Sequence, residues 1–307
     1  MSKNNTDYHN PVMLKECLDG LNIRPDGIYV DVTFGGGGHS RAIFDLLSSK
    51  GILVAFDQDV QAKENIWGAK NFHFVESNFS FLRNQLKLRG ITKVDGILAD
   101  LGVSSHQFDE GDRGFSIRSN APLDMRMNQK AAISAANIVN DYEVNEIARI
   151  LGQYGELKNA GRIARGIVSF RSNKKIETTG DLMAATRPFA PKFKDRKFFA
   201  QVFQGIRIEV NDEMKTLESF LLQTEDVLAP GGRLVVMSYH SLEDRPVKNY
   251  MKRGSLDGTI EKDFFGNILK PFTEINRHPI EASEVERETN NRARSAKLRI
   301  AERNDGE

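Results

Sequence analysis

Apolar runs and amphipathic stretches alternate over the first hundred residues. Strand-like runs lie at 28–32, 52–56, 72–76 and 94–99, and helix-like periodicity lies at 12–20, 39–49, 59–66 and 78–89. Such alternation predicts a parallel α/β sheet. Ligands of these sheets bind beyond the carboxyl ends of the strands. The residues at those ends are Asp31, Asp57, Asn78 with Phe79, and Asp100, and we expect them to share one crevice.

A helical pattern replaces this alternation between Asp109 and about Gln204. A capping box from Asn140 to Glu143 precedes an amphipathic stretch at 144–151, and residues 163–170 continue the pattern. The alternation returns with a helix over 212–228, a turn at 230–232 and a strand over 233–237. The pattern predicts two domains: a discontinuous α/β domain of residues 1–112 and 206–307, and an inserted helical domain of residues 113–205.

Four consecutive glycines, Gly35 to Gly38, follow the first predicted strand and precede a predicted helix. Glycine lets a backbone approach a ligand closely, and a helix start offers unpaired N–H groups. The dinucleotide pattern G-x-G-x-x-G fails at Ser40, and the phosphate-loop pattern fails because no lysine follows Gly38. The second predicted strand ends in Asp57, which suits a ribose. This layout also suits S-adenosylmethionine, although a glycine-rich turn without a ligand has the same appearance.

Composition indicates a folded chain large enough for more than one core, with 307 residues, 39% hydrophobic and 28% charged. The N-terminus lacks an apolar signal segment and no run has the length of a membrane span. We therefore expect a cytoplasmic protein that does not bind a membrane. The single Cys17 excludes an internal disulfide, and one cysteine with six histidines, none in paired-ligand spacing, predicts no metal site.

Basic residues concentrate between positions 158 and 200. Eleven lysines and arginines face three acidic residues in that segment, which leaves 32 basic against 39 acidic residues of the total 43 and 42 elsewhere. Phenylalanines at 189, 193, 198 and 199 lie among them. Such a surface suits unpaired RNA, because lysine and arginine meet phosphates and aromatic rings stack on bases. A solvated basic face over phenylalanines of the core is the alternative.

A second basic cluster lies at 290–299 and contains Arg292, Arg294 and Arg299. Its alternation predicts a strand, with at least one arginine at the strand end because the three do not share one face. Phosphate binding and pairing with Glu286 or Glu288 are both consistent with the sequence.

Seven motifs occur in an order that resembles the bacterial RsmH (MraW) methyltransferases over nearly the whole chain. They are HNPVMLKE at 9–16, DVTFGGGGHS at 31–40, DGILADLGVSS at 95–105, RGFS at 113–116, PLDMRM at 122–127, SYHSLEDR at 238–245 and RARS at 292–295. Departures are minor: Gly205 stands where the family usually has alanine, and Asn291 replaces the proline usual before Arg292.

This resemblance implies a class I S-adenosylmethionine-dependent methyltransferase, which has a Rossmann-like α/β fold, with an inserted all-helical domain that recognises RNA. The implied reaction transfers a methyl group to the N4 amine of a cytidine in 16S ribosomal RNA. The implied partner is 16S ribosomal RNA or the small ribosomal subunit, and the protein is expected to be a monomer or a homodimer. Another RNA or a protein as substrate, and a non-catalytic RNA-binding protein, are the alternatives.

The resemblance also implies the contacts of the cofactor. Gly37, Gly38 and His39 would lie against the methionine moiety, Asp57 would bind the ribose hydroxyls, Phe79 would pack on the adenine, and Asp100 with Gln107 would border the amino-acid end or the methyl group.

The fourth predicted strand is not followed by the Pro-Pro-aromatic motif with which DNA amino-methyltransferases polarise an amine. Our hypothesis is therefore that Asp100 or a loop carbonyl accepts from the amine. Catalytic contributions are expected from Ser238, His240 or Ser241.

Overall fold

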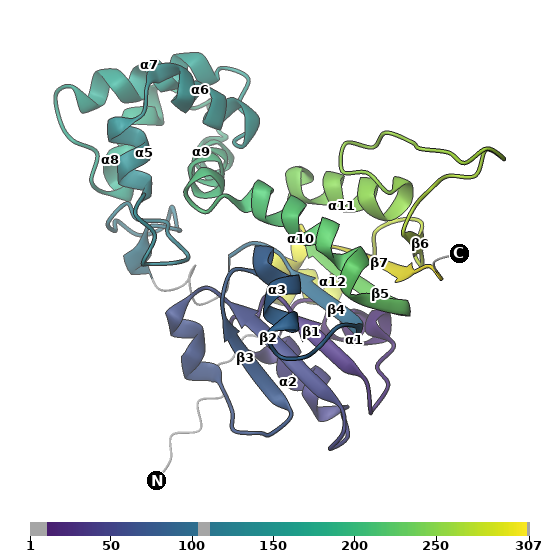
Figure 1. Cartoon of the computed structure of the whole chain (residues 1–307). Helices are drawn as coiled ribbons and strands as arrows, with labels where there is room; N and C mark the ends of the chain where they lie inside the picture. Colours follow the sequence, from purple (N-terminus) through teal and green to yellow (C-terminus); the bar gives the residue numbers. More distant parts are fainter. Residues whose placement is uncertain (1–10, 104–110, 306–307) are drawn as a thin grey trace, which may run out of the picture. The chain divides into compact units, whose positions relative to one another are not determined.

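The computed structural model describes residues 11–103 and 111–305 (Figure 1). The chain divides into two compact units, one of Met1–Gly102 with Met214–Glu307 and one of Val103–Glu213. We call them the sheet unit and the helical unit. The expected domain borders at 112 and 205 both lie inside the helical unit. Helix α9 (Asp195–Val210) continues through position 205, and its Val202, Phe203 and Ile206 are buried in the helical unit's core, so a border there would divide one packed helix.

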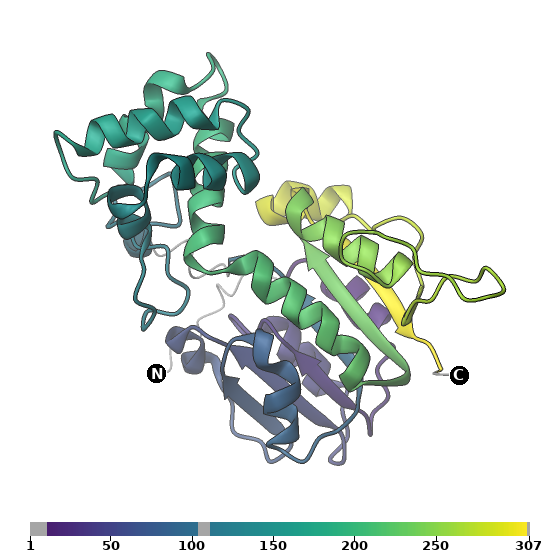
Figure 2. The same ribbon diagram turned by 45° about the horizontal axis from the view of Figure 1, so that its top comes forward.

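A seven-stranded sheet in the order β3-β2-β1-β4-β5-β7-β6 forms the sheet unit (Figure 2). The strands are β1 (Ile28–Asp31), β2 (Ile52–Asp57), β3 (Phe72–Glu76), β4 (Val94–Asp100), β5 (Leu228–Ser238), β6 (Phe272–Glu274) and β7 (Lys297–Arg303). The five predicted strands are confirmed as β1 to β5, which are mutually parallel. The sheet has two strands more than the five predicted: β7 pairs antiparallel with β5, and β6 pairs antiparallel with β7 at the edge.

Helices cover both faces of this sheet. Helices α1 (Leu14–Leu21) and α2 (Gly38–Asp45) pack with Leu53 and Ala55 on one face. Helices α3 (Leu82–Lys87), α10 (Glu213–Val227) and α11 (Ser241–Arg253) pack with Val54 and Phe56 on the other. Successive residues of β2 therefore enter opposite cores, which explains the continuous apolar run of this strand.

Two predicted helices of the sheet unit differ from the expectation. The segment expected as a helix over 59–66 is a 3-10 helix, η1 (Val60–Asn65). The segment expected as one helix over 78–89 is divided into η2 (Phe79–Phe81) and α3. Asn78 explains the irregular start, because its side chain accepts a hydrogen bond from the Ser80 N–H and so caps a short turn.

The basic cluster at 290–299 is a strand only in its last part. Helix α12 (Glu284–Thr289) and the 3-10 helix η5 (Asn291–Arg294) precede β7, which begins at Lys297. The Asn290 side chain accepts from the Arg292 N–H at 3.1 Å, and this local bond starts the 3-10 turn instead of the expected strand. Arg292 and Arg294 consequently lie outside the sheet.

The described residues of the helical unit confirm the expected helical insertion. Its elements are η3 (Gly111–Arg113), α5 (Ala135–Asp141), α6 (Val144–Gln153), α7 (Ala160–Arg171), α8 (Thr179–Thr186), η4 (Arg187–Phe189) and α9. Ile150, Ile163 and Ile167 pack with α9 in its core. No helix in the described part of either unit combines the length and apolarity needed to cross a membrane.

The capping box expected from Asn140 to Glu143 is wrong. Asn140 lies inside α5, where its side chain bonds the backbone of Ala136 and of Ile176. The box that starts α6 runs from Glu143 to Glu146. Asn140 is instead a bridge to the segment before α8, a long-range role that local pattern cannot reveal.

Candidate functional site

The glycine loop joins β1 to α2 and requires glycine at two positions. Gly37 has a φ of 77°, in the left-handed region that favours glycine. A Cβ on Gly38 would lie 2.4 Å from Cγ of Pro11. Because α2 begins at Gly38, the first-turn N–H groups of Gly38, His39 and Ser40 have no acceptor within the helix. The loop can therefore bind a carboxylate with backbone N–H groups.

Asp31 holds this loop in shape. Its buried carboxylate accepts from the Ser40 hydroxyl at 2.6 Å and from the Thr33 N–H at 3.0 Å. The Thr33 hydroxyl in turn accepts from the N–H of Asp100 at 2.7 Å. The end of β1, the start of α2 and the end of β4 are thus joined by one chain of hydrogen bonds.

Asp57, at the end of β2, bonds the same loop. Its Oδ2 accepts from the Gly35 N–H and its Oδ1 from the Asp59 N–H, both at 2.8 Å. Each oxygen retains a second lone pair, which a ribose hydroxyl can use. Burial raises the pKa of the Asp57 carboxyl to about 6, against the lowering effect of the two backbone N–H groups.

Phe79 lies half-buried just beyond β3. Its ring makes an edge contact with Phe220 of α10, with centroids 5.4 Å apart. The ring is thus held in place by one neighbour while part of its surface stays accessible. This arrangement is suited to packing against a flat ring, the role expected of it.

Asp100 lies at the end of β4 next to the start of α2. Its Oδ1 accepts from the Tyr239 hydroxyl at 2.7 Å, and its Oδ2 lies 3.9 Å from Nδ1 of His39. The other ring nitrogen of His39 lies 3.0 Å from the Val12 carbonyl, to which it donates. Burial raises the pKa of the Asp100 carboxyl, opposed by His39 and by the hydrogen bond from Tyr239.

Tyr239 is a residue that the sequence analysis missed. Burial and the neighbouring Asp100 raise its pKa well above the ordinary range, so its hydroxyl stays protonated as a donor. The sequence carries no local signal for this contact, because it depends on strand pairing: Met237 of β5 is in register with Asp100 of β4. Two residues further, just beyond β5, the side chain of Tyr239 returns to the same face.

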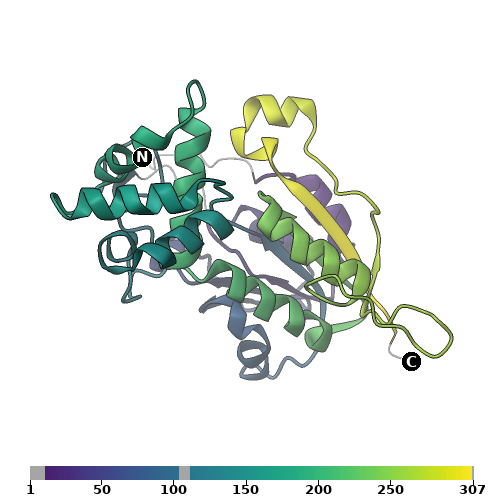
Figure 3. The same cartoon turned by 90° about the horizontal axis from the view of Figure 1, so that it is seen from above.

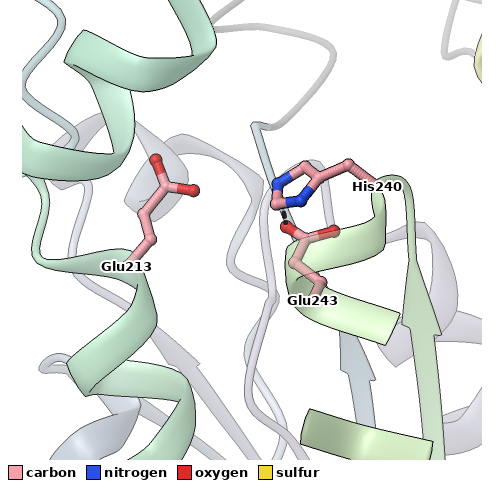
Figure 4. A group of neighbouring side chains, drawn as sticks. All are labelled: Glu213, His240 and Glu243. Atoms are coloured by element: carbon pink, nitrogen blue, oxygen red, sulfur yellow. Dashed lines mark ion pairs between the residues drawn. The ribbon is translucent and has the colours of Figure 1, made fainter. Parts of the chain in front are cut away.

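The three residues expected beside Tyr239 differ in environment. Ser238 is buried, and its hydroxyl donates to the Lys297 carbonyl of β7 at 3.5 Å. Ser241 is exposed at the first position of α11. His240 precedes α11, and its Nε2 lies 3.1 Å from Oε1 of Glu243, an ion-pair distance without hydrogen-bond alignment (Figure 4).

Glu243 contacts both His240 and Tyr239, the residue that donates to Asp100. Its Oε2 accepts from the Tyr239 N–H at 2.8 Å, and the side chain is buried. Tyr239 is therefore held at its backbone by Glu243 and at its hydroxyl by Asp100. Gln107, the remaining expected site residue, lies outside the described residues.

The C-terminal arginines divide between structural and electrostatic roles. Arg299 forms a two-point ion pair with Asp244 of α11, at 2.7 and 3.1 Å (Figure 3 shows β7 and α11). Arg294 donates to the Arg287 carbonyl. Neither contact is with Glu286 or Glu288, the partners considered from the sequence. Burial raises the pKa of both Asp100 and Tyr239, and the positive charge of Arg292 partly opposes that rise.

The basic segment of the helical unit contains both residues with contacts inside the unit and residues exposed to solvent. Arg171 donates to the Val139 and Tyr142 carbonyls, and Lys174 pairs with Asp181 at 2.6 Å. Phe198 and Phe199 are core residues, as the alternative reading of the sequence had it, whereas Phe193 is fully exposed. Only part of the basic and aromatic set is therefore accessible to a partner.

Comparison with known proteins gives concordant matches over almost the whole chain. The model of the MraW methylase family matches residues 6–304. A protein of Parabacteroides distasonis named ribosomal RNA small subunit methyltransferase H is 55% identical over 304 residues, which cover 99% of this chain and 100% of the relative. A protein of the same name from Bacteroides thetaiotaomicron is 52% identical over 303 residues, covering 99% and 100%.

Proposed function

The chain belongs to the MraW methylase family, and from this membership we propose that it methylates the N4 amine of a cytidine in the 16S RNA of the small ribosomal subunit. The names of the two relatives support RNA of the small subunit as substrate. The observation that carries the proposal is the placement of the Asp100 carboxylate beside the first turn of α2. It brings a hydrogen-bond acceptor for an amine next to a loop suited to the methyl donor.

The residues of the sheet unit fit S-adenosylmethionine, the donor of this family. Gly37, Gly38 and His39 would bind the methionine carboxylate through backbone N–H groups, because the first turn of α2 leaves N–H groups without an acceptor within the helix. Asp57 would accept from the ribose hydroxyls, and Phe79 would pack on the adenine. The cofactor supplies a methyl group on a sulfonium, which is already activated for transfer.

Asp100 is proposed as the residue that acts on the amine. The N4 lone pair is delocalised into the cytosine ring, so the amine is a poor nucleophile. A carboxylate that accepts from an amine hydrogen favours localisation of this lone pair as the new bond forms. Oδ2 is the oxygen we assign to this contact, since Tyr239 donates to Oδ1. The same oxygen can take the proton that the nitrogen loses.

Positioning of the amine relative to the methyl group is the second contribution to the rate of methyl transfer. Holding an amine in line with a bound methyl group can contribute about 7–11 kcal/mol through proximity. The chain of hydrogen bonds through Asp31, Thr33 and Asp100 fixes the Asp100 carboxylate relative to the glycine loop. We assign no catalytic role to Ser238, whose hydroxyl bonds β7, and keep His240 as a residue that, with Glu243, supports Tyr239.

We place the reaction in the cytoplasm, where ribosomal subunits are assembled. The experiment that tests the proposal is methyl transfer to small subunits purified from a strain that lacks the enzyme, followed by mapping of the modified nucleotide. Incorporation at one cytidine N4, lost in Asp100→Ala, is the expected result. Methylation of protein, or none at all with cofactor bound, would contradict the proposal.

A further inference from the structure

A hollow of about 250 Å³ lies within the helical unit, between the α6–α7 connection and the start of α9. Lys158, Lys194 and Lys197 line it, together with the polar side chains of Asn159 and Gln201. The buried ring of Phe198 contributes an apolar wall. No residue of this hollow has a part in the methyl-donor site.

The three lysines at this hollow have no acidic partner among the residues that the structure describes. Other basic residues of the helical unit do form ion pairs, Lys174 with Asp181 and Arg149 with Glu209. Glu156 is the one acidic residue of the lining. Three ammonium groups beside a single carboxylate repel one another, and an anion between them relieves that repulsion.

The start of a helix strengthens this preference for an anion. Helix α7 begins at the hollow with Asn159 as its N-cap residue, and the Asn159 side chain makes no capping hydrogen bond. The N–H groups of Ala160 and Arg162 in the first turn already donate to the carbonyls of Leu157 and Asn159, so what this helix start offers an anion is the positive end of its dipole, which lies at the lysines.

An aromatic side chain stands in the loop that carries two of the lining residues. Phe193 lies between Pro191 and Lys194, is fully exposed, and has a φ of 64°. A bulky residue rarely adopts this left-handed conformation, and exposure of a whole phenylalanine ring is unfavourable in water. The ring offers both faces to a flat partner.

We propose that this hollow binds the backbone of an unpaired RNA strand, with a phosphate between Lys158, Lys194 and Lys197 and a neighbouring base stacked on Phe193. The space is smaller than the roughly 300–1,000 Å³ typical of small-molecule sites and suits a phosphate group. Lysines next to a stacking ring are the combination used for single strands without sequence preference. The inference rests on the proposed function and specifies where the helical unit holds its RNA.

The first test measures RNA affinity of the full-length triple variant Lys158→Gln, Lys194→Gln, Lys197→Gln. The probe is a fluorescent unstructured RNA of about 12 nucleotides, and anisotropy is recorded over a range of salt concentrations. Affinity should fall about tenfold or more, and the slope of log K against log salt should become shallower by about 0.7, the change expected when one phosphate contact is lost.

A matched control separates this site from the effect of net charge. Lys70→Gln, Lys87→Gln, Lys252→Gln removes the same three charges from exposed positions of the sheet unit. The control should change affinity by less than about twofold and leave the slope almost unaltered. Equal losses in the two triple variants would overturn the lysine site.

Phe193→Ala tests the stacking contact separately. Because the ring is fully exposed, its removal leaves the core intact. Affinity should fall about fivefold or more with an unchanged salt slope, since a stacked base is lost but no phosphate contact. An unaltered affinity would overturn this half of the inference.

Two further measurements distinguish this inference from the proposed function. All variants should bind S-adenosylmethionine like the wild type, because their substitutions lie outside the donor site. If the wild type methylates small subunits but the lysine variant keeps full RNA affinity, the hollow is not the RNA site and the proposed function stands. If the wild type fails to methylate small subunits, the proposed function fails, whatever the RNA affinities show.

Discussion

At the scale of single residues, the candidate site depends on a few carboxylates whose hydrogen bonds are almost all local to strand ends. The carboxylate of Asp31 accepts hydrogen bonds from Thr33 and Ser40, so its role is structural. Asp57 and Asp100 retain acceptor capacity toward a ligand. The same residue type thus serves two purposes, and the difference is decided by which donors surround each carboxylate.

Tyr239→Phe should lower kcat by about ten- to a hundredfold while cofactor affinity changes less than about twofold. The substitution removes a donor to a partly buried carboxylate, and a hydrogen bond to a charged group contributes about 1.5–3 kcal/mol. Loss of the donor also raises the pKa of Asp100 further, so the acid limb of the kcat–pH profile should move to higher pH.

Tyr250→Phe is the matched control, because it removes the hydroxyl that donates to Glu225 in the same unit. Single-turnover rates of both variants over a pH series provide the measurement. If the two variants behave alike, Tyr239 has no specific part in positioning Asp100.

Cofactor affinity should depend on pH through Asp57. Its ionised form accepts from hydroxyl groups, so a bound ribose favours ionisation and the affinity is greatest above the pKa of about 6. Below that pH, affinity should fall by up to about tenfold per pH unit, since protonation must be reversed on binding.

Isothermal titration between about pH 5 and 8 measures this dependence. Asp57→Asn, which removes the titrating group but keeps the shape, should bind more weakly and with a nearly flat pH profile. Asp59 and Asp31 raise the pKa of Asp57 and are unchanged in this variant. A flat profile in the wild type would show that Asp57 does not meet the ribose.

At the scale of secondary-structure elements, sequence periodicity predicts the five parallel strands because each is an uninterrupted apolar run. It is less successful where a polar side chain bonds nearby backbone. Asn78 divides a predicted helix, Asn140 imitates a capping residue, and Asn290 starts a 3-10 turn within a predicted strand. Each asparagine offers a local alternative to regular structure.

Arg299→Ala should destabilise the sheet unit by about 3–5 kcal/mol. Arg299 and Asp244 are both largely buried, and their ion pair fixes β7 against α11. Truncation of one partner leaves an uncompensated buried charge, which is the costly case. The fluorescence of Trp67, the single tryptophan of the chain, reports unfolding of this unit in urea.

Arg294→Ala provides the comparison, because this arginine is exposed and donates to the Arg287 carbonyl, a backbone group and not an acid; the substitution should cost less than about 1 kcal/mol. The double variant Arg299→Ala, Asp244→Ala should be less destabilised than the sum of the two single changes. Additive losses would mean that the two side chains do not act as a pair.

At the scale of the whole molecule, the near-neutral total of +1 conceals a segment, residues 158–200, with eleven basic and three acidic residues. The structure places this segment in the helical unit, whereas the described residues proposed for the donor site belong to the sheet unit. RNA at the helical unit and S-adenosylmethionine at the sheet unit would therefore meet very different electrostatic surroundings.

The two ligands should accordingly respond differently to salt. Affinity for small subunits should fall steeply, with a slope of log K against log salt more negative than about −3, because several phosphate contacts release counterions. Affinity for S-adenosylmethionine should change less than about twofold over the same range. Similar slopes for both ligands would be evidence against an electrostatic role of the helical unit.

The strand-end acids, the glycine loop and the helical insertion are predictable from the amino-acid sequence, because periodicity and turn chemistry are local properties of the chain. Asp57 and Asp100 were recognisable for the same reason, since each ends a continuous apolar run.

Contacts between residues far apart in the sequence are set by how the strands and helices pack. Tyr239 reaches Asp100 because β5 pairs with β4 across a long insertion, and Arg299 reaches Asp244 because β7 returns antiparallel beside β5. Phe198 became core and Phe193 surface according to the packing of α9. These outcomes depend on burial and on strand neighbours, which a linear pattern does not contain.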